Sequence, residues 1–124
     1  MEKKVNIMPS LIMSGFYEAR KLADEVEERM KSHSLCQKIS EEEFTINKNK
    51  IIHMVFEHYD IRVGFPTMTI ALIMDKGGVT VINVVASNET SVSMSDSCEA
   101  ENKYIKLAED LLLKKNFMID KENF

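Results

Sequence analysis

The chain has 124 residues, of which 44% are hydrophobic and 29% charged, with four glycines and two prolines. This length and composition are typical of a single globular domain over residues 1–124, and they exclude a fibrous repeat or a long disordered segment. The formal net charge is −4, and the 16 basic residues are scattered rather than clustered, which argues against a nucleic-acid-binding protein.

The first predicted element is an amphipathic helix over residues 10–32. Apolar residues recur there at spacings of three and four, and charged residues occupy the opposite face. The Met8-Pro9 step sets the start of the helix, and Ser10 or Ser14 is expected to cap it. The apolar positions are Phe16, Ala19, Leu22, Ala23, Val26 and Met30.

Four strands are predicted within residues 43–87. Residues 44–46, 51–56, 68–74 and 79–86 are apolar or alternate between apolar and polar. Turns are expected at residues 47–50, 64–66 and 75–78, and the acidic triplet at residues 41–43 is expected to be a solvated turn. Because the connections are too short for a parallel crossover, the strands are expected to form an antiparallel meander.

A second helix is predicted over residues 97–115. Its apolar stripe includes Tyr104, Ala108 and Leu112, and Asn116 is a plausible residue for its C-terminal end. Residues 117–119 are expected to fold back as a short strand or a hydrophobic tail. The order α-β-β-β-β-α therefore predicts an α+β two-layer domain, with a four-stranded antiparallel meander and both helices on one face.

The hairpin at residues 75–78 predicts which residues share a face of the sheet. A loop centred on Lys76-Gly77 pairs Met74 with Val79, and the face of Met74 carries the larger side chains, so we expect it to meet the helices. The second face is uncharged and moderately apolar, which favours a homodimer interface, with a ligand groove or an ordinary exposed face as alternatives. The expected interface or ligand-binding residues are Tyr59, Thr69, Ala71, Ile73, Thr80, Ile82 and Val84.

The stretch HMVFEHYD, residues 53–60, concentrates residues capable of acid–base or metal chemistry. On a strand, His53 and Glu57 share one face but lie ~13 Å apart, and His58 lies on the other face. We therefore expect no metal site, and we keep Glu57 with His53 or His58 as weak candidates for an acid–base pair. The larger apolar residues of this segment stand at even positions up to residue 56 and at odd positions from residue 59 onward. This change predicts a bulge or bend near Glu57 and His58, or a loop over residues 60–67.

The two cysteines, Cys36 and Cys98, lack the spacing of a zinc site. We expect two reduced thiols, with a single disulfide as the alternative. The N-terminal sequence resembles an export signal only loosely, because Asn6 and Pro9 interrupt its apolar stretch. No apolar run approaches the roughly 18 residues of a membrane span, so a cytoplasmic protein is expected.

The segment Val55-Phe56-Glu57-His58-Tyr59, followed by an apolar strand and a glycine-bearing hairpin, resembles a small bacterial family from Firmicutes. In that family of unknown function the central strand reads V-[FY]-E-R-Y, and His58 departs from its usual arginine. The resemblance covers residues 20–115 in pattern and implies a similar order of helix, strands and helix. It implies no activity.

Together these features favour an intracellular interaction or small-ligand-binding module that forms a homodimer through the open face of its sheet. The alternative is an enzyme that uses Glu57 with His53 or His58 as acid and base. No cofactor, metal, nucleic acid or membrane is expected as a partner, and the sequence does not identify a small-molecule ligand.

Overall fold

A computed structural model describes residues 9–32, 35–59, 66–88 and 95–120 of the chain. They form an α+β fold with two helices and a six-stranded antiparallel sheet. In chain order the elements are β1 (Ser10–Gly15), α1 (Ala19–Lys31), β2 (Leu35–Ile46), β3 (Asn49–Tyr59), β4 (Thr67–Lys76), β5 (Val79–Asn88), α2 (Ser95–Lys114) and β6 (Met118–Ile119).

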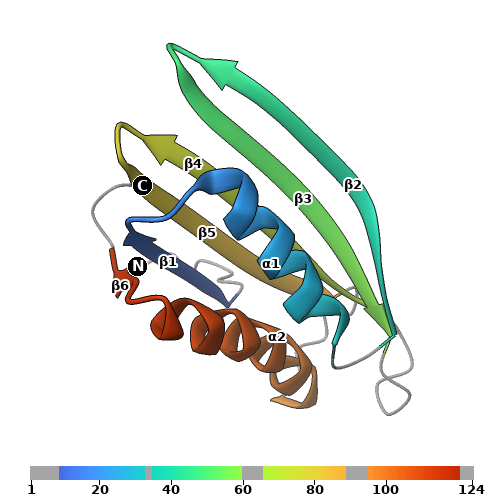
Figure 1. The fold of residues 1–124 in the computed structure, drawn as a ribbon. Coiled ribbons are helices and arrows are strands. Elements are labelled where there is room, and N and C mark those ends of the chain that lie inside the picture. Colours follow the sequence, from blue (N-terminus) through green and yellow to red (C-terminus); the bar gives the residue numbers. More distant parts are fainter. Residues whose placement is uncertain (1–8, 33–34, 60–65, 89–94, 121–124) are drawn as a thin grey trace, which may run out of the picture.

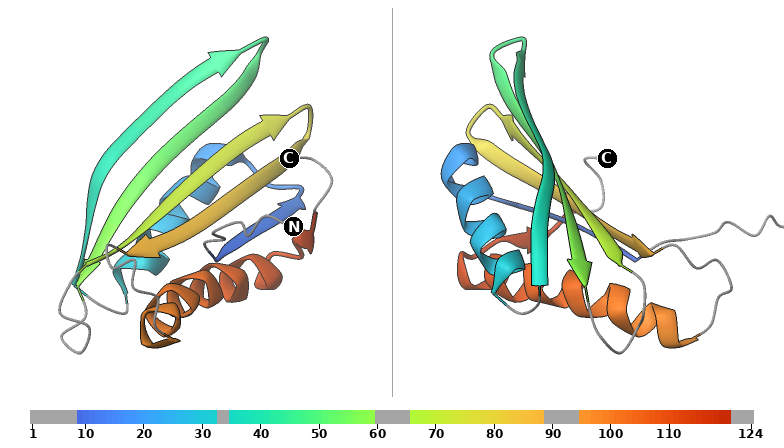
Figure 2. Two further views of the ribbon diagram at one scale, coloured as in Figure 1. Left: turned by 180° about the vertical axis from the view of Figure 1, so that it is seen from behind. Right: turned by 90° about the vertical axis from the view of Figure 1, so that its right-hand side faces the viewer.

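The strands are arranged in the order β2-β3-β4-β5-β1-β6 (Figure 1). Strands β2 to β5 follow one another as neighbours, and β1 and β6 extend this meander beyond β5. Both helices lie on the same face of the sheet, as the two views in Figure 2 show. The α+β class is therefore as expected from the sequence, and the sheet has two more strands than predicted.

The predicted helix over residues 10–32 is wrong in its first part. Residues 10–15 form β1, in which Leu11 and Met13 are buried and Ile12, between them, is less buried. The helix begins only after Glu18, whose carboxylate accepts hydrogen bonds from the backbone N–H groups of Arg20 and Lys21. The predicted apolar positions from residue 19 onward are buried, whereas Phe16 is 82% exposed.

The acidic triplet at residues 41–43 lies within β2 and is not a turn. Glu41 and Glu43 point toward the helix side, where both accept hydrogen bonds from Arg20, at 2.7 and 3.1 Å. Lys38 also bonds to Glu41 and, at 2.9 Å, to Glu27 of α1. These ion pairs hold the edge strand against α1, which explains how so acidic a segment is part of the sheet.

The β4–β5 hairpin turns on Gly77 and Gly78, both of which have a positive φ. Lys76 therefore pairs with Val79, and Met74 pairs with Val81 rather than with Val79 as predicted. The two-residue turn requires left-handed backbone at both central positions, which glycine adopts without steric cost. This shift of two residues leaves the membership of each face unchanged.

The predicted choice of face is wrong. Six of the seven residues expected at the open face lie beneath the helices and are at most 1% exposed, whereas Tyr59 is 44% exposed on the opposite side of the sheet. The helices supply the bulky side chains of the core, such as Leu22, Met30, Tyr104 and Leu112, so the sheet beneath them needs small and β-branched residues. The misassigned residues are Thr69, Ala71, Ile73, Thr80, Ile82 and Val84.

Gly15, at the end of β1, is in close contact with the aromatic ring of Phe117. A Cβ atom at Gly15 would lie 2.7 Å from the ring of Phe117, which is itself 2% exposed. We therefore expect Gly15→Ala to lower the free energy of unfolding by about 1–3 kcal/mol through overpacking. Urea unfolding measures this loss.

The control for this prediction is the double variant Gly15→Ala with Phe117→Leu. A smaller side chain at residue 117 relieves the clash, so the two substitutions together should cost less than the sum of their separate effects. Strictly additive losses would contradict a contact between the two positions.

Candidate functional site

The candidate functional site is the face of the sheet that carries no helix among the described residues. Seen from behind, the sheet lies in front of α1 (Figure 2, left). Strand β4 places four consecutive outward residues of this face at its centre, and all four are apolar: Met68, Ile70, Leu72 and Met74. Ile70 is 38% exposed. We call this surface the uncovered face.

The uncovered face also includes outward side chains of the neighbouring strands. The register between β3 and β4 places Val55 beside Ile70, and that between β4 and β5 places Val85 on its other side. Strand β2 adds several exposed apolar side chains at the edge. Large apolar residues of this face that are at least 38% exposed are Leu35, Phe44, Ile46, Tyr59 and Ile70.

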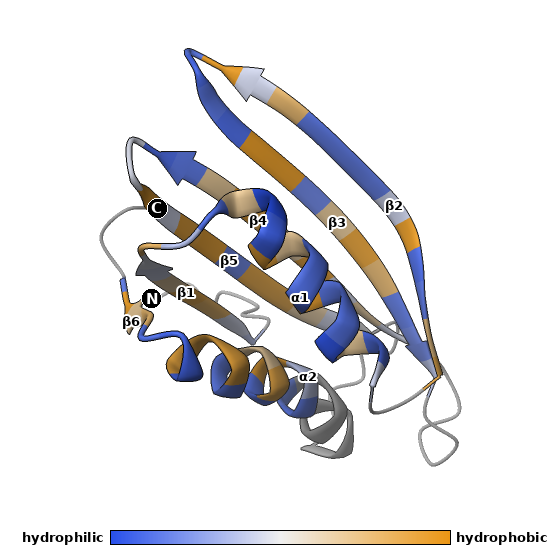
Figure 3. Cartoon of the chain, in the orientation of Figure 1, coloured by the Kyte–Doolittle hydropathy of each residue, from blue (hydrophilic) through white to orange (hydrophobic). Residues whose placement is uncertain are grey.

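Charge is distributed unequally between the two sides of the sheet. On the helix side, Arg20 and Lys38 hold the pKa of Glu41 at about 2 through their hydrogen bonds. The outer side of α1 is hydrophilic (Figure 3). On the uncovered face, the carboxylates of β2 and β3 are those of Glu42 and Glu57, and the outward positions of β4 between residues 68 and 74 are uncharged. The centre of the uncovered face is therefore apolar.

Strand geometry separates the polar groups of residues 53–59. His53, Glu57 and Tyr59 lie on the uncovered face, and the Tyr59 hydroxyl donates a hydrogen bond to Glu57 at 2.5 Å. This hydrogen bond raises the pKa of Tyr59. His58 points to the opposite face, beneath the helices. Asp60 lies outside the described residues.

His58 is fully buried. Its Nε2 atom lies 2.8 Å from Oγ1 of Thr69, and its ring stacks on Tyr104 with centroids 3.9 Å apart. Burial, with a smaller contribution from the charge of Lys103, lowers the pKa of His58 to about 4. The imidazole is therefore neutral at physiological pH and acts as a packed core residue.

The bulge predicted near Glu57 and His58 is not found. The pairing of β3 with β4 continues without a shift from Ile51 to His58, and the irregularity lies instead in β2, between Lys38 and Ser40. The alternation of apolar residues along β3 is interrupted at His58, because this histidine occupies a core position that an apolar residue would otherwise fill.

The acid–base candidates are not brought together. Glu57 and His58 project from opposite faces of one strand, and His53 and Glu57 are four residues apart on an extended backbone, or roughly 13 Å. Across the described parts of the chain, no group of three His, Cys, Asp or Glu residues is placed to hold a metal ion. Neither helix there is long and apolar enough to span a bilayer.

Cys36 is a free thiol on the helix side of β2 and is half-buried. Burial raises its pKa to about 11, so the thiol is protonated and a poor nucleophile at neutral pH. The side chain of Cys98 lies outside the described residues, so the structure does not bear on the predicted redox state of that residue.

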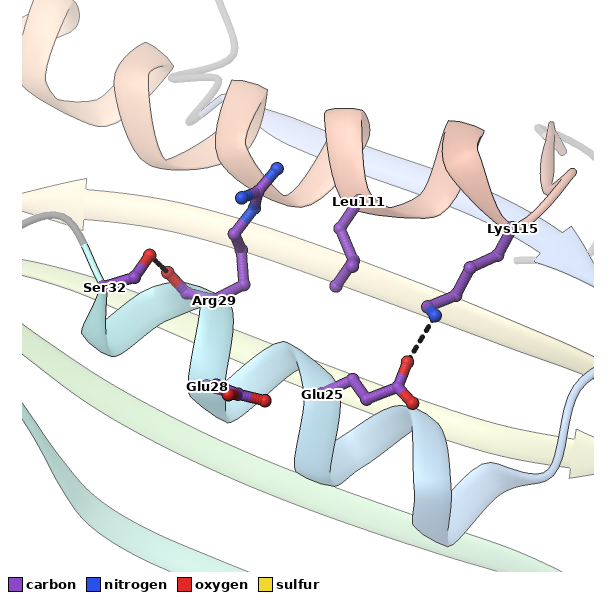
Figure 4. A pocket seen from close by; sticks show the side chains of 6 residues that line it. All are labelled: Glu25, Glu28, Arg29, Ser32, Leu111 and Lys115. Carbon is purple, nitrogen blue, oxygen red and sulfur yellow. Dashed lines mark hydrogen bonds and ion pairs between the residues drawn. The ribbon is translucent and has the colours of Figure 1, made fainter.

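A solvent-open pocket of about 420 Å³ lies between α1 and α2 (Figure 4). Two of its charged groups are engaged with each other, since Lys115 forms an ion pair with Glu25, and Glu25 also accepts a hydrogen bond from Tyr17 at 2.9 Å. Arg29 donates a weak hydrogen bond to the carbonyl of Leu107 at 3.5 Å. These contacts join the two helices. The pocket is lined by Glu25, Glu28, Arg29, Ser32, Leu111 and Lys115.

Comparison with protein-family models and with curated proteins found no match to this chain. The case for a function therefore rests on geometry. The sequence analysis missed the outward residues of β4, although they form an unbroken apolar series at every second position from 68 to 74. That series marks one face of β4 as apolar, but the opposite face is apolar too, and the packing of the helices decides which of the two is covered.

Proposed function

We propose that this protein is a non-catalytic interaction module and that the uncovered face is its binding surface. The observation that carries the proposal is the all-apolar outward series of β4, which lies at the centre of the sheet without a helix over it. Contiguous exposed apolar surface of this kind marks interaction sites in soluble proteins. A cytoplasmic location and membership of the Firmicutes family remain predictions from the sequence.

The shape of this surface favours a macromolecular partner over a small ligand. Small-molecule sites are concave and enclose most of their ligand, whereas the outward side chains of a sheet form a broad pleated surface. The pocket of about 420 Å³ described above lies on the opposite side, between the helices. The sequence predicts a second copy of the chain as the partner.

The acid–base alternative has less support. A general base and a general acid need to reach the same substrate atom or two neighbouring ones. His58 is enclosed beneath the helices, while Glu57 is hydrogen-bonded to Tyr59 on the uncovered face. The pair of His53 and Glu57 shares a face, but the two residues lie roughly 13 Å apart along β3.

Site-specific photo-cross-linking in the cells that produce the protein tests the proposal. A photoreactive residue at position 70 should form covalent adducts with a protein partner, because Ile70 lies at the centre of the uncovered face. The matched control is position 113, because Leu113 is also a large, exposed apolar residue (51%) but lies on α2. Equal labelling at the two positions, or none at position 70, would contradict the proposal.

A further inference from the structure

Strands β3 and β5 carry the same pattern of apolar and polar residues on the uncovered face, at matching positions on either side of β4. Reading along the strands, the order is apolar, polar, apolar, polar on both. The register places each pair level with one residue of β4. The pairs are Ile51 and Val81 beside Met74, His53 and Asn83 beside Leu72, Val55 and Val85 beside Ile70, and Glu57 and Ser87 beside Met68. The first pair is already buried within one chain, at 8% and 1% exposure, so the other three pairs offer the accessible surface.

This match is what a face-to-face dimer requires if its two-fold axis runs along β4. Such an axis lies in the plane of the interface, places β4 over the partner's β4, and places β3 over the partner's β5 at the same level. This inference rests on the function proposed above: we infer that the partner at the uncovered face is a second copy of this chain, related to the first by a two-fold axis in the plane of the interface. Closed two-fold dimers are the commonest assemblies of soluble proteins.

The contacts across this interface are chemically compatible. Val55 meets the partner's Val85, and Ile70 meets its own copy, which gives the interface an apolar centre. His53 lies opposite the partner's Asn83, and Glu57 opposite the partner's Ser87, whose hydroxyl is able to donate to the carboxylate. His53 and Glu57 therefore each meet a hydrogen-bonding group, as burial requires. Nearer the edge of the sheet, Glu42 of β2 falls over the partner's Ile12 in this arrangement.

The other simple arrangement has its axis across the strands, at the level of Ile70. It places β3 over the partner's β3 in the reverse direction, so that His53 falls on the partner's Glu57 and Val55 on its own copy. Both arrangements bring apolar residues onto apolar residues and polar residues onto polar residues at the centre of the face, and they differ in which side chains of β3 meet.

The size of the face suits a stable dimer. Five strands about 4.8 Å apart and eight residues long at about 3.3 Å per residue span roughly 600 Å² in projection, before side-chain relief is added. Standard protein interfaces bury about 800 Å² on each partner. Because packed sheets are twisted, the strands of the two copies should cross at about 30°, so the axis follows β4 only to within half of that angle.

Light scattering on the purified protein tests whether the partner is a second copy. At high micromolar concentration the protein should have twice the mass of one chain. Ile70→Asp places two carboxylates opposite each other on the axis, and we expect it to weaken dimerisation by at least about 100-fold. Leu113→Asp, on α2, should leave the mass unchanged, and circular dichroism confirms that both variants are folded. A monomeric wild-type protein would overturn the inference.

Cysteine cross-linking tests the axis. In a background with Cys36→Ser and Cys98→Ser, Ile70→Cys alone should be joined to its copy by a short bis-maleimide. If the axis runs along β4, Val55→Cys alone should react poorly, since its copy lies about 10 Å to the side, two strands away, and a mixture of Val55→Cys and Val85→Cys chains should react well. Efficient linkage of Val55→Cys to itself, in a protein of dimer mass, would place the axis across the strands. Failure of Ile70→Cys to link to its copy would overturn the inference.

These outcomes separate the inference from the proposed function. If the purified protein is monomeric but position 70 still labels another protein in cells, the surface binds a different partner, and only the inference fails. If position 70 labels nothing and the protein is monomeric, both fail.

Discussion

Replacing Ile82 by aspartate is expected to unfold the protein. Ile82 is fully buried in β5 beneath the helices and belongs to the main hydrophobic cluster. The substitution removes a large apolar side chain and places a carboxylate where its described neighbours are apolar, which costs several kcal/mol. Domains of this size are stable by only about 5–15 kcal/mol. Far-UV circular dichroism and urea unfolding measure the result.

The matched control for Ile82→Asp is Ile70→Asp, which is expected to remain folded. Both replace isoleucine by aspartate on neighbouring strands of the sheet, but Ile70 is 38% exposed on the uncovered face. The face assignment made from the sequence alone predicts the reverse, namely that Ile82→Asp gives a folded monomer. A native unfolding midpoint for Ile82→Asp would show that the helices cover the other face.

His58 is expected to make the fold sensitive to mild acid. Its pKa falls from the ordinary value of 6.5 to about 4 in the folded protein, chiefly because of burial. The unfolded chain therefore binds a proton at His58 before the folded chain does. The contribution to stability is fully present above pH 6.5 and is lost as the pH falls from 6.5 to about 4, by roughly 3 kcal/mol in all.

The variant His58→Phe isolates this effect. Phenylalanine keeps an aromatic ring against Tyr104 but does not titrate, and the loss of the hydrogen bond to Thr69 lowers stability about equally at every pH. Urea unfolding at several pH values should show that the difference in unfolding free energy between the two proteins shifts in favour of His58→Phe as the pH drops. A constant difference would mean that folding leaves the pKa of His58 unchanged.

Local sequence patterns predicted those elements in which apolar residues recur at regular spacing. The core positions of α1 from Ala19 to Met30 follow from helical spacing, and Asn116, with a φ of 65°, ends α2 as expected. The short strand β6 was one of the two expectations for residues 117–119, and it is confirmed. Strand β1 was missed because six alternating residues next to a real helix are easily read as its first turns, and its pairing with β5 is a long-range contact.

The choice of sheet face was beyond local patterns for a different reason. Both faces of β4 and β5 are apolar, so periodicity shows that the residues alternate but not which set meets the helices. The larger residues of β4 appeared suited to the core. In the fold the helices supply that bulk, and the smaller set, which includes Ala71 and Val84, lies beneath them. Only the packing of elements distant in sequence decides between the two.

The candidate site was misplaced by one buried polar residue. His58 breaks the apolar series of β3, and in the sequence such a break predicts a structural irregularity. Its burial depends on Thr69 and Tyr104, which are 11 and 46 positions away in the sequence. No spacing rule within residues 53–60 reveals these partners.

The edge strand β2 limits how the protein can assemble. It is twelve residues long, and an edge of this length normally invites another strand to add to the sheet. Here the register shift between Lys38 and Ser40 interrupts the edge, and charged side chains lie along it, two of them paired with Arg20. Both features oppose the addition of a strand from another chain to this edge, a process that can lead to fibres. Association through a face has no such barrier and ends once two faces have met, so the charges of β2 favour a closed, finite particle over an open polymer.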